Sequence, residues 1–329
     1  MRQFVEFSSP LSLPPLLKPV AAAPLPQREN PGAPARCVDF LLQPRRTLDV
    51  RFDSDSRTIW CSMRHENSVS WTLPLLREFN ALNADIRALY ERNHFDEPPV
   101  KFLVGGSLRP GVFNLGGDLP FFLDRVRARD AEGLRQYAYA CIEAIYNIYH
   151  GFDSPVVTMA VLEGDALGGG LEAALSCQFV IAERGVNLGF PEALFHTFPG
   201  MGAYSLISRR LDASRAEKLI MSGRMYKAEE LHEMGLIDML AEKGEGRARA
   251  RAFIAENGKR HSLLGAIGKV RRRIAPLPMD ELQDITDIWV DSVMHLAPIN
   301  LRKMEMLAQS QDRRFEQTAN SRFKPAQNR

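Results

Sequence analysis

A glycine-rich turn followed by a glutamate is the feature of this chain whose residue types and spacing best suit chemistry. Gly168, Gly169 and Gly170 separate an apolar, β-branched run from a segment of helical pattern, and Glu172 falls in the first turn of that segment. The first N–H groups of a helix have no partner within the helix, and a carbonyl placed against one of them is polarised. The turn therefore predicts a site that stabilises negative charge on a ligand oxygen, although a tight packing turn has the same appearance.

A second carboxylate follows the next predicted strand. Glu192 comes directly after Pro191, on a loop that we expect at the same edge of the sheet as Glu172. Two carboxylates in one poorly solvated cleft repel each other, so the pKa of one rises and the pair can divide acid and base roles. A glutamate at the start of a helix is the ordinary alternative.

A second glycine turn, Gly116-Gly117-Asp118, also follows a predicted strand. By itself it reads as a turn with Asp118 as the N-cap of the helix after it, and Pro120 fits that helix's first turn. Together with the other glycine turn it provides a second backbone donor. We predict that the N–H groups of Gly117 and Gly169 form an oxyanion hole, with Glu172 and Glu192 as the acid/base pair.

The elements that must position these residues are strands and helices of an α/β protein. An alternating pattern predicts a strand at 48–52, and a second candidate strand follows at 57–63 after a turn. Apolar runs predict buried strands at 100–104, 156–162 and 178–182. A strand, a glycine turn, a helix and another strand make a βαβ unit, which produces a parallel sheet. Helical spacing predicts helices over the ranges 74–90, 132–150, 171–176, 204–210, 213–221 and 228–234.

The chain divides into four segments by composition. Residues 1–36 are rich in Pro and Ala, and we expect a flexible tail there. Residues 37–245 form the α/β core, in which the stretch from Val38 to Met63 suits β structure. Residues 246–315 read as helices that close the site and contribute to an oligomer interface, and residues 316–329 as a frayed tail.

Composition excludes several classes of function. The net charge of +2 over 329 residues gives no reason to expect a nucleic-acid partner, and no stretch approaches the roughly 20 apolar residues of a membrane span. Four cysteines are scattered without metal-ligand spacing, so we expect reduced thiols and no metal site. Because prolines interrupt the N-terminal segment, a secretory signal is not expected, and we predict a cytoplasmic enzyme.

Three segments in this order resemble the crotonase (enoyl-CoA hydratase/isomerase) superfamily. They are FNLGGD at 113–118, ALGGGLE at 166–172, and the Pro-Glu pair at 191–192 that is followed by Pro-Gly at 199–200. The resemblance covers residues 45–310. It implies the ClpP/crotonase fold, in which repeated ββα units form a spiral core, here with an all-α C-terminal region. It also implies the roles predicted above for the two glycines and the two glutamates.

Within that superfamily the chain looks most like the diffusible-signal-factor synthases. The segments that carry this resemblance are 109–119, 164–176 and 228–238. It implies dehydration of a 3-hydroxyacyl chain to a cis-2-enoyl thioester and thioester hydrolysis to a free cis-2-unsaturated fatty acid, a quorum-sensing signal. The substrate is carried on the phosphopantetheine of acyl carrier protein or on CoA, and no other cofactor is implied.

The resemblance also implies binding residues and partners. A cognate sensor kinase domain is an implied partner, and the subunits are expected to form a homotrimer or a dimer of trimers. Because acyl carrier protein is acidic, a basic rim is expected at the entrance, with candidates at 209–210 and 269–273. The residues implied for the acyl tunnel are Leu167, Gly168, Met201, Trp289 and Leu307.

Two other interpretations stay open. A general enoyl-CoA hydratase of fatty acid metabolism would share the glutamates and glycines, but such enzymes continue as Pro-Gly-Ala-Gly-Gly where this chain has Pro199-Gly-Met-Gly-Ala-Tyr204. A regulatory binding module that keeps the fold and binds a partner is the second. The presence of both glutamates and both glycine donors weighs against a purely non-catalytic module.

Overall fold

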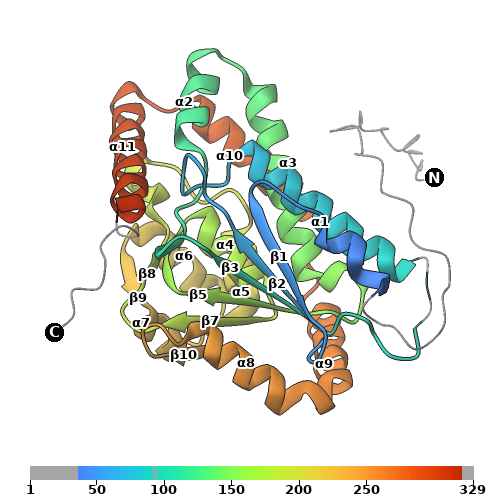
Figure 1. Ribbon diagram of the computed structural model, residues 1–329. Coiled ribbons are helices and arrows are strands. Elements are labelled where there is room, and N and C mark those ends of the chain that lie inside the picture. The colour runs from blue at the N-terminus through green and yellow to red at the C-terminus, as the bar shows by residue number, and fades with distance from the viewer. Residues whose placement is uncertain (1–35, 92, 94, 321–329) are drawn as a thin grey trace, which may run out of the picture.

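The computed structural model describes residues 36–91, 93 and 95–320. Among these residues the strands form two sheets (Figure 1). The larger sheet has the order β1-β2-β3-β5-β7-β10 and the smaller has the order β4-β6-β8-β9. The strands are β1 (Leu48–Asp53), β2 (Thr58–Met63), β3 (Phe102–Ser107), β4 (Gly111–Asn114), β5 (Val157–Leu162), β6 (Gly164–Leu167), β7 (Phe179–Glu183), β8 (Asn187–Gly189), β9 (Met225–Lys227) and β10 (Met239–Ala241).

From β3 to β8 consecutive strands alternate between the two sheets, and this alternation generates a spiral. The pairs β3–β4, β5–β6 and β7–β8 each place their first strand in the larger sheet and their second in the smaller. A helical segment follows each pair, so the repeated unit is ββα. Within each sheet these strands run parallel. The expected crotonase fold is therefore confirmed.

Helices surround the sheets. They are α1 (Leu73–Glu91), α2 (Leu119–Arg127), α3 (Ala131–Tyr149), α4 (Gly169–Ser176), α5 (Ala203–Arg210), α6 (Ala213–Ser222), α7 (Ala228–Glu233), α8 (Gly246–Asn257), α9 (His261–Ile274), α10 (Met279–Met294) and α11 (Pro298–Asn320), with 3-10 turns η1 (Arg36–Leu42), η2 (Gly151–Asp153), η3 (Pro191–Phe195) and η4 (Gly258–Arg260). Among the described residues, no helix has the length and apolar character that crossing a membrane requires.

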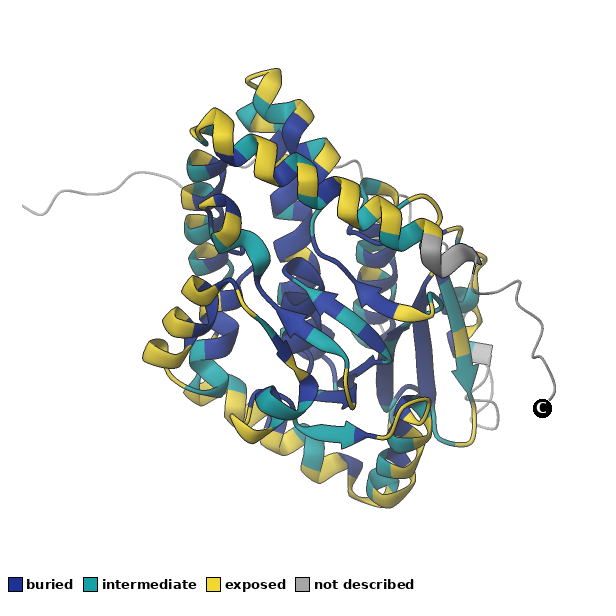
Figure 2. Ribbon diagram, turned by 90° about the vertical axis from the view of Figure 1, so that its left-hand side faces the viewer, coloured by how far each residue is buried: buried dark blue, intermediate teal, exposed yellow. Residues whose placement is uncertain are grey.

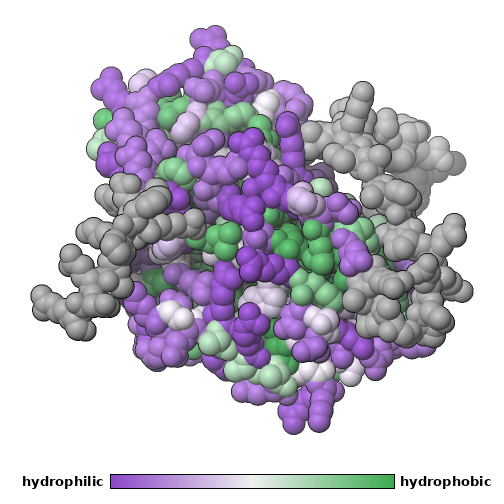
Figure 3. Space-filling model, in the orientation of Figure 1, coloured by the Kyte–Doolittle hydropathy of each residue, from purple (hydrophilic) through white to green (hydrophobic). Residues whose placement is uncertain are grey.

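The core lies between the sheets and the helices that cover them. All six residues of β5 are buried, as a strand covered on both faces requires, and all eight residues of α4 are buried as well. Figure 2 shows dark blue strands at the centre and helices whose outer sides are yellow. The face drawn in Figure 3 is mostly hydrophilic, with smaller hydrophobic groups between. The catalytic candidates on α4 are thus held by a helix that is buried along its whole length.

The predicted elements differ from the structure in three places. Residues 36–42 form the 3-10 turn η1, whereas β structure was expected from Val38 onward. The strands β4, β6, β8, β9 and β10 are three or four residues long and carry too short a pattern for periodicity to detect, yet the first four of them build the smaller sheet. Helix α11 continues to Asn320, beyond the expected boundary at 315. The predicted tail at 1–35 and the end of the predicted tail at 321–329 lie outside the described residues.

Candidate active site

The two glycine turns lie against each other, as an oxyanion hole requires. A Cβ built on Gly116 would lie 3.3 Å from the backbone nitrogen of Gly169. Gly169 is the first residue of α4, where an N–H has no acceptor within the helix. Among the described residues, neither the N–H of Gly117 nor that of Gly169 has a hydrogen-bond acceptor. Two free donors from separate turns therefore converge on one place.

Trp71 joins the two turns. Its backbone N–H donates to the carbonyl of Gly116 at 2.8 Å, and its indole Nε1–H donates to the carbonyl of Gly169 at 3.0 Å. The hydroxyl of Tyr137 donates to the carbonyl of Trp71 and accepts from the N–H of Asp118. Trp71 is 2% exposed, so these bonds lie in the interior. Sequence reasoning missed both aromatic residues, because a lone Trp or Tyr at helical or loop spacing carries no functional signal.

Glu172 is held by the loop that precedes α5. Its Oε1 accepts hydrogen bonds from the backbone N–H groups of Met201 and Ala203, both at 2.8 Å. Gly202 stands between these two donors with φ +108°, a left-handed conformation that turns alternate N–H groups toward the same oxygen. With one oxygen fixed in this way and a side chain only 1% exposed, Glu172 presents its other oxygen in a single direction.

Glu192 lies in the 3-10 turn η3, which Pro191 begins. Its Oε2 is out of contact with solvent and has no hydrogen-bond partner among the described residues. A buried polar atom without a partner is costly in a folded protein, and it marks a group that a ligand or a reaction can use. Glu192 is thus the carboxylate of the pair whose free oxygen faces no protein donor.

The surroundings raise the pKa of both glutamates. Burial, and then the charge of Glu192, raise the pKa of Glu172 to about 8, in spite of the two N–H donors. Burial raises the pKa of Glu192 to about 7. Because the charge of Glu192 opposes the ionisation of Glu172, the two carboxyls titrate as a pair, and near neutral pH the pair can hold a proton. Such a pair can take a proton at one carboxyl and give a proton at the other.

A cavity of about 400 Å³ contains these groups. Gly117, Gly169, Glu172 and Glu192 all line it. The apolar part of its wall comes from helices α2, α3, α10 and α11, from β6, β9 and η3, and from the loops before α2 and α5. The apolar and aromatic lining residues include Leu115, Leu119, Phe122, Tyr137, Ala138, Cys141, Leu167, Phe195, Met201, Trp289 and Leu307. The structure thus brings the predicted donors and glutamates together in one mostly apolar space.

Four of the five residues predicted for the acyl tunnel lie at this cavity, and their role in binding an acyl chain stays a prediction. Leu167, Met201, Trp289 and Leu307 line the cavity, whereas Gly168 does not. A Cβ on Gly168 would collide with the carboxyl of Glu192, so that side chain lies against the glycine where a tunnel wall was expected. The φ of +48° at Gly168 instead allows the turn from β6 into α4. The missing side chain at Gly168 therefore leaves room for the carboxyl of Glu192, and a direct role of Gly168 in substrate binding stays a prediction.

The expected basic rim does not border this cavity. Arg209, Arg210, Arg271 and Arg272 surround a smaller hollow with Cys177 and Gln178, which follow the C-terminal end of α4. Gly169, the predicted oxyanion donor, lies at the opposite end of the same helix. In Figure 1, α9 lies at the lower right and α11, which carries Leu307 over the cavity, at the upper left. A carrier docked on these arginines would not face the catalytic cavity.

Helix α11 closes the cavity through polar contacts that the sequence did not indicate. Gln311 Nε2 donates to the carbonyl of Leu115 at 2.8 Å, and Arg314 forms an ion pair with Asp165 at 3.1 Å. Gln311, Arg314 and Asp165 all line the cavity. Within the described part of the chain, no group of three or more His, Cys, Asp or Glu side chains could hold a metal ion.

Comparison with known proteins decides the family. The model of the enoyl-CoA hydratase/isomerase family matches residues 79–262, which is more than half of the chain. The chain belongs to the enoyl-CoA hydratase/isomerase family. Its sequence is 33% identical over 185 residues to "Probable enoyl-CoA hydratase echA17" of Mycobacterium avium. This match covers 55% of the chain and 67% of the relative. The chain is 28% identical to "Probable enoyl-CoA hydratase 2, mitochondrial" of Arabidopsis thaliana, covering 67% of the chain and 72% of the relative.

Solved structures show the same fold for this family member. An enoyl-CoA hydratase/isomerase from Xanthobacter autotrophicus Py2 superposes with a TM-score of 0.66 at 18% identity, covering 86% of this chain and all of that one. DspI from Pseudomonas aeruginosa superposes with a TM-score of 0.60 at 24% identity, covering 76% of this chain and 96% of that one. At these identities the likeness establishes the fold alone.

Proposed function

We propose that this enzyme dehydrates a 3-hydroxyacyl thioester to a cis-2-enoyl thioester and then hydrolyses the thioester to a free cis-2-unsaturated fatty acid. The observation that carries the proposal is the meeting of a buried glutamate, Glu172, a half-buried one, Glu192, and two unpartnered N–H groups in one apolar cavity. Its volume of about 400 Å³ lies in the range of small-molecule sites, and its apolar wall suits an acyl chain.

The dehydration uses the two donors and the two carboxyls together. The N–H groups of Gly117 and Gly169 bind the thioester oxygen and stabilise the enolate that forms when the α-proton leaves. One glutamate, as carboxylate, takes that proton, and the other, as carboxylic acid, protonates the 3-hydroxyl as its C–O bond breaks. Water departs, and the pair again holds one proton, now on the other carboxyl. Each acid or base contribution is worth roughly 10²–10⁴-fold in rate.

The hydrolysis uses the same oxyanion hole. A glutamate takes a proton from water as the water oxygen attacks the thioester carbonyl. The C–S bond then breaks, and the glutamate passes that proton to the sulfur, which leaves as the thiol. Oε2 of Glu192, which has no hydrogen-bond partner among the described residues, supports the choice of Glu192 as this base. The products are the free acid and the carrier thiol, so the step needs no further reactant.

We propose acyl carrier protein as the donor of the substrate and a homotrimer as the assembly, with a sensor kinase domain as a second partner. These follow from the resemblance of the segments at 109–119, 164–176 and 228–238 to the signal-factor synthases. Because the arginines at 209–210 and 271–272 lie away from the cavity, we place the carrier at the exposed lining residues of the cavity. Leu194 and Ser310 are among these residues. Light scattering on the purified protein tests the trimer.

A general enoyl-CoA hydratase is the second candidate, and it is favoured by the names of the curated relatives. Such an enzyme would use the same glutamates and glycines but would interconvert trans-2-enoyl-CoA and 3-hydroxyacyl-CoA without releasing the acid. The loop at Met201 to Tyr204, which holds Glu172, departs from the sequence that hydratases carry there.

Product analysis separates the two candidates. Purified enzyme is incubated with 3-hydroxyacyl-carrier substrates of several lengths and with trans-2-enoyl-CoA, beside the Glu172→Gln and Glu192→Gln variants. Chromatography that resolves cis from trans acids, with mass detection, is the measurement. We expect a free cis-2-enoic acid that falls at least 10²-fold in each variant.

Other results would replace the proposal. A trans-enoyl or hydrated thioester without free acid assigns the enzyme to the general hydratases. No turnover of either substrate by wild type would favour a binding module that keeps the fold.

A further inference from the structure

One peptide unit beside the active site is held at both of its polar ends. The N–H of Met201 donates to Oε1 of Glu172 at 2.8 Å. The carbonyl of the same peptide, that of Gly200, accepts a hydrogen bond from the hydroxyl of Thr286 at 3.1 Å. Thr286 is 0% exposed, so its hydroxyl has no water to bond instead. The peptide plane that presents a donor to Glu172 is therefore fixed from the other side by a threonine on α10.

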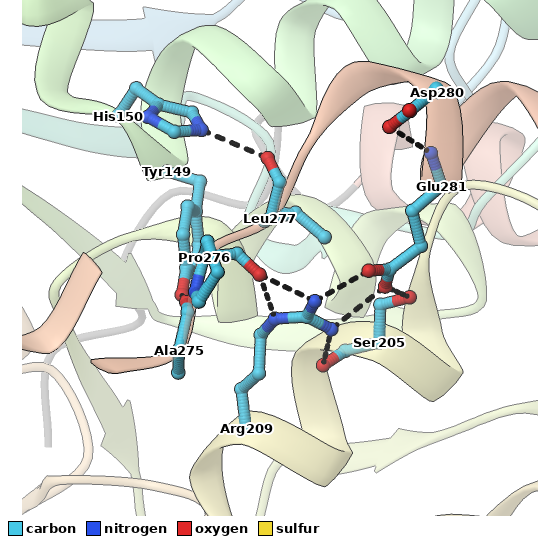
Figure 4. A network of polar contacts seen from close by, with 9 residues as sticks. All are labelled: Tyr149, His150, Ser205, Arg209, Ala275, Pro276, Leu277, Asp280 and Glu281. Atoms are coloured by element: carbon cyan, nitrogen blue, oxygen red, sulfur yellow. Dashed lines mark hydrogen bonds and ion pairs between the residues drawn. The ribbon is translucent and has the colours of Figure 1, made fainter. Parts of the chain in front are cut away.

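Helix α10 is itself fastened to the helix that begins with the second donor. Arg209 on α5 forms an ion pair with Glu281 at 2.6 Å and donates to the carbonyl of Pro276, while the hydroxyl of Ser205 donates to Glu281 at 2.5 Å (Figure 4). Ala203, the first residue of α5, provides the other N–H to Glu172. The contacts at Glu281 thus set α10, and with it Thr286, relative to both donors.

Packing keeps the same face of α10 on this loop. Trp289 lies one helical turn beyond Thr286 and packs on Gly200, and Leu282 lies one turn before it and packs on Gly202. Thr286 is the hydroxyl-bearing residue between these two apolar contacts. Its position is therefore determined by the helix, and its hydroxyl has the carbonyl of Gly200 as its acceptor.

We propose that Thr286 is a positioning residue for Glu172, acting through the Gly200–Met201 peptide. It touches neither substrate nor reacting atoms. By bonding the carbonyl it fixes the tilt of the peptide and polarises its N–H, which strengthens the bond that the N–H makes to the carboxylate. This inference rests on the proposed catalytic role of Glu172.

The electrostatic consequence has a definite direction. The groups that face Glu172 are Glu192 from η3, whose charge opposes its ionisation, Cys141 from α3, and the two N–H donors, which favour ionisation. Weakening one of those donors leaves the opposing groups unchanged. The pKa of Glu172 then rises further, and any limb of the pH–rate profile that reports Glu172 moves to higher pH, whichever of its two forms is active.

The test compares three variants with wild type in the turnover assay described above. Thr286→Val keeps the shape and loses the hydroxyl, Thr286→Ser keeps the hydroxyl, and Thr158→Val removes a buried hydroxyl from β5, away from the site. We expect Thr286→Val to lower kcat by about three- to tenfold, as the loss of one buried hydrogen bond implies, and to shift the limb upward by about half a pH unit. Thr286→Ser should keep kcat and the pH–rate profile close to those of wild type. Thr158→Val should leave the limb of the pH–rate profile at its wild-type pH.

A second readout does not depend on turnover. The difference in melting temperature between Glu172→Gln and wild type is measured against pH, with and without Thr286→Val. We expect the midpoint of this difference curve to lie at a higher pH when Thr286→Val is present. An unmoved midpoint and limb, or an equal shift in Thr158→Val, would overturn the positioning role. If wild type turns over neither substrate, the proposed function fails, and this second readout still decides whether Thr286 acts on Glu172.

Discussion

Glu172 and Glu192 lower the stability of the folded protein by an amount that depends on pH. Their pKa values are raised to about 8 and about 7, from 4.5 in an unfolded chain. Between about pH 4.5 and about pH 8 the folded state holds protons that the unfolded state has released, so stability falls as pH rises through this window. The two glutamates therefore reduce the free energy of unfolding least in acid and most in mild alkali.

Replacing either carboxyl removes this dependence. We expect the melting temperature of Glu172→Gln to exceed that of wild type by a margin that grows from pH 5 to pH 8. The margin of Glu192→Gln over wild type should grow in the same way and reach its full size at a lower pH. Differential scanning calorimetry across this range is the measurement, with the exposed Glu256→Gln as a control. A margin independent of pH would contradict the raised pKa values.

At the scale of elements, α11 is the part that limits the cavity. It contributes Leu307 to the wall and is fastened by Gln311 and Arg314 to the turn at Leu115 and to β6. Because a helix places successive residues about 100° apart, Met306 lies on a different side and is 67% exposed. Substitutions at positions 306 and 307 therefore distinguish an effect inside the cavity from an effect on the helix.

A larger residue at position 307 should shorten the acyl chain that the cavity accepts. We expect Leu307→Trp to shift the product profile toward shorter acids, because the added volume occupies space in the cavity. Met306→Trp, with its side chain in solvent, should leave the profile unchanged. Mass spectrometry of products from a mixture of chain lengths measures both. Identical profiles for Leu307→Trp and wild type would remove α11 from the list of chain-length determinants.

At the scale of the whole molecule, the cysteines report on the integrity of the core. Cys61, Cys141 and Cys177 are buried, while Cys37 is partly exposed. Burial raises the pKa of Cys61 and of Cys177 to about 12, and raises the pKa of Cys141 as well. Since the thiolate is the reactive form, these three thiols are protected both by access and by protonation.

Thiol titration should therefore follow unfolding. At pH 8 we expect at most one thiol, Cys37, to react with a disulfide reagent in the native protein and all four to react in denaturant. In increasing urea, the loss of protection at the three buried thiols should coincide with the loss of far-ultraviolet circular dichroism. Reaction of a buried thiol well before that transition would show that the core opens locally.

Local patterns in the chain determined the main elements and the candidate chemistry. The alternation at β1, the buried run at β5, the cap at Asp118 and the glycine turn before α4 depend on neighbouring residues, and the structure confirms each of them. The placement of the two glutamates in one cavity also follows from local pattern, because parallel strands end at the same edge of a sheet. Their catalytic roles stay predictions.

Only the tertiary structure decided what supports that chemistry. Trp71 bonds Gly169 across 98 positions of sequence, and Thr286 bonds Gly200 across 86. Neither residue type at such a separation produces a periodic or motif signal. The same holds for the arginines at 209–210 and 271–272, whose charge the sequence displays but whose distance from the cavity it does not. Contacts between distant segments depend on how the whole chain packs, and local pattern carries no information about them.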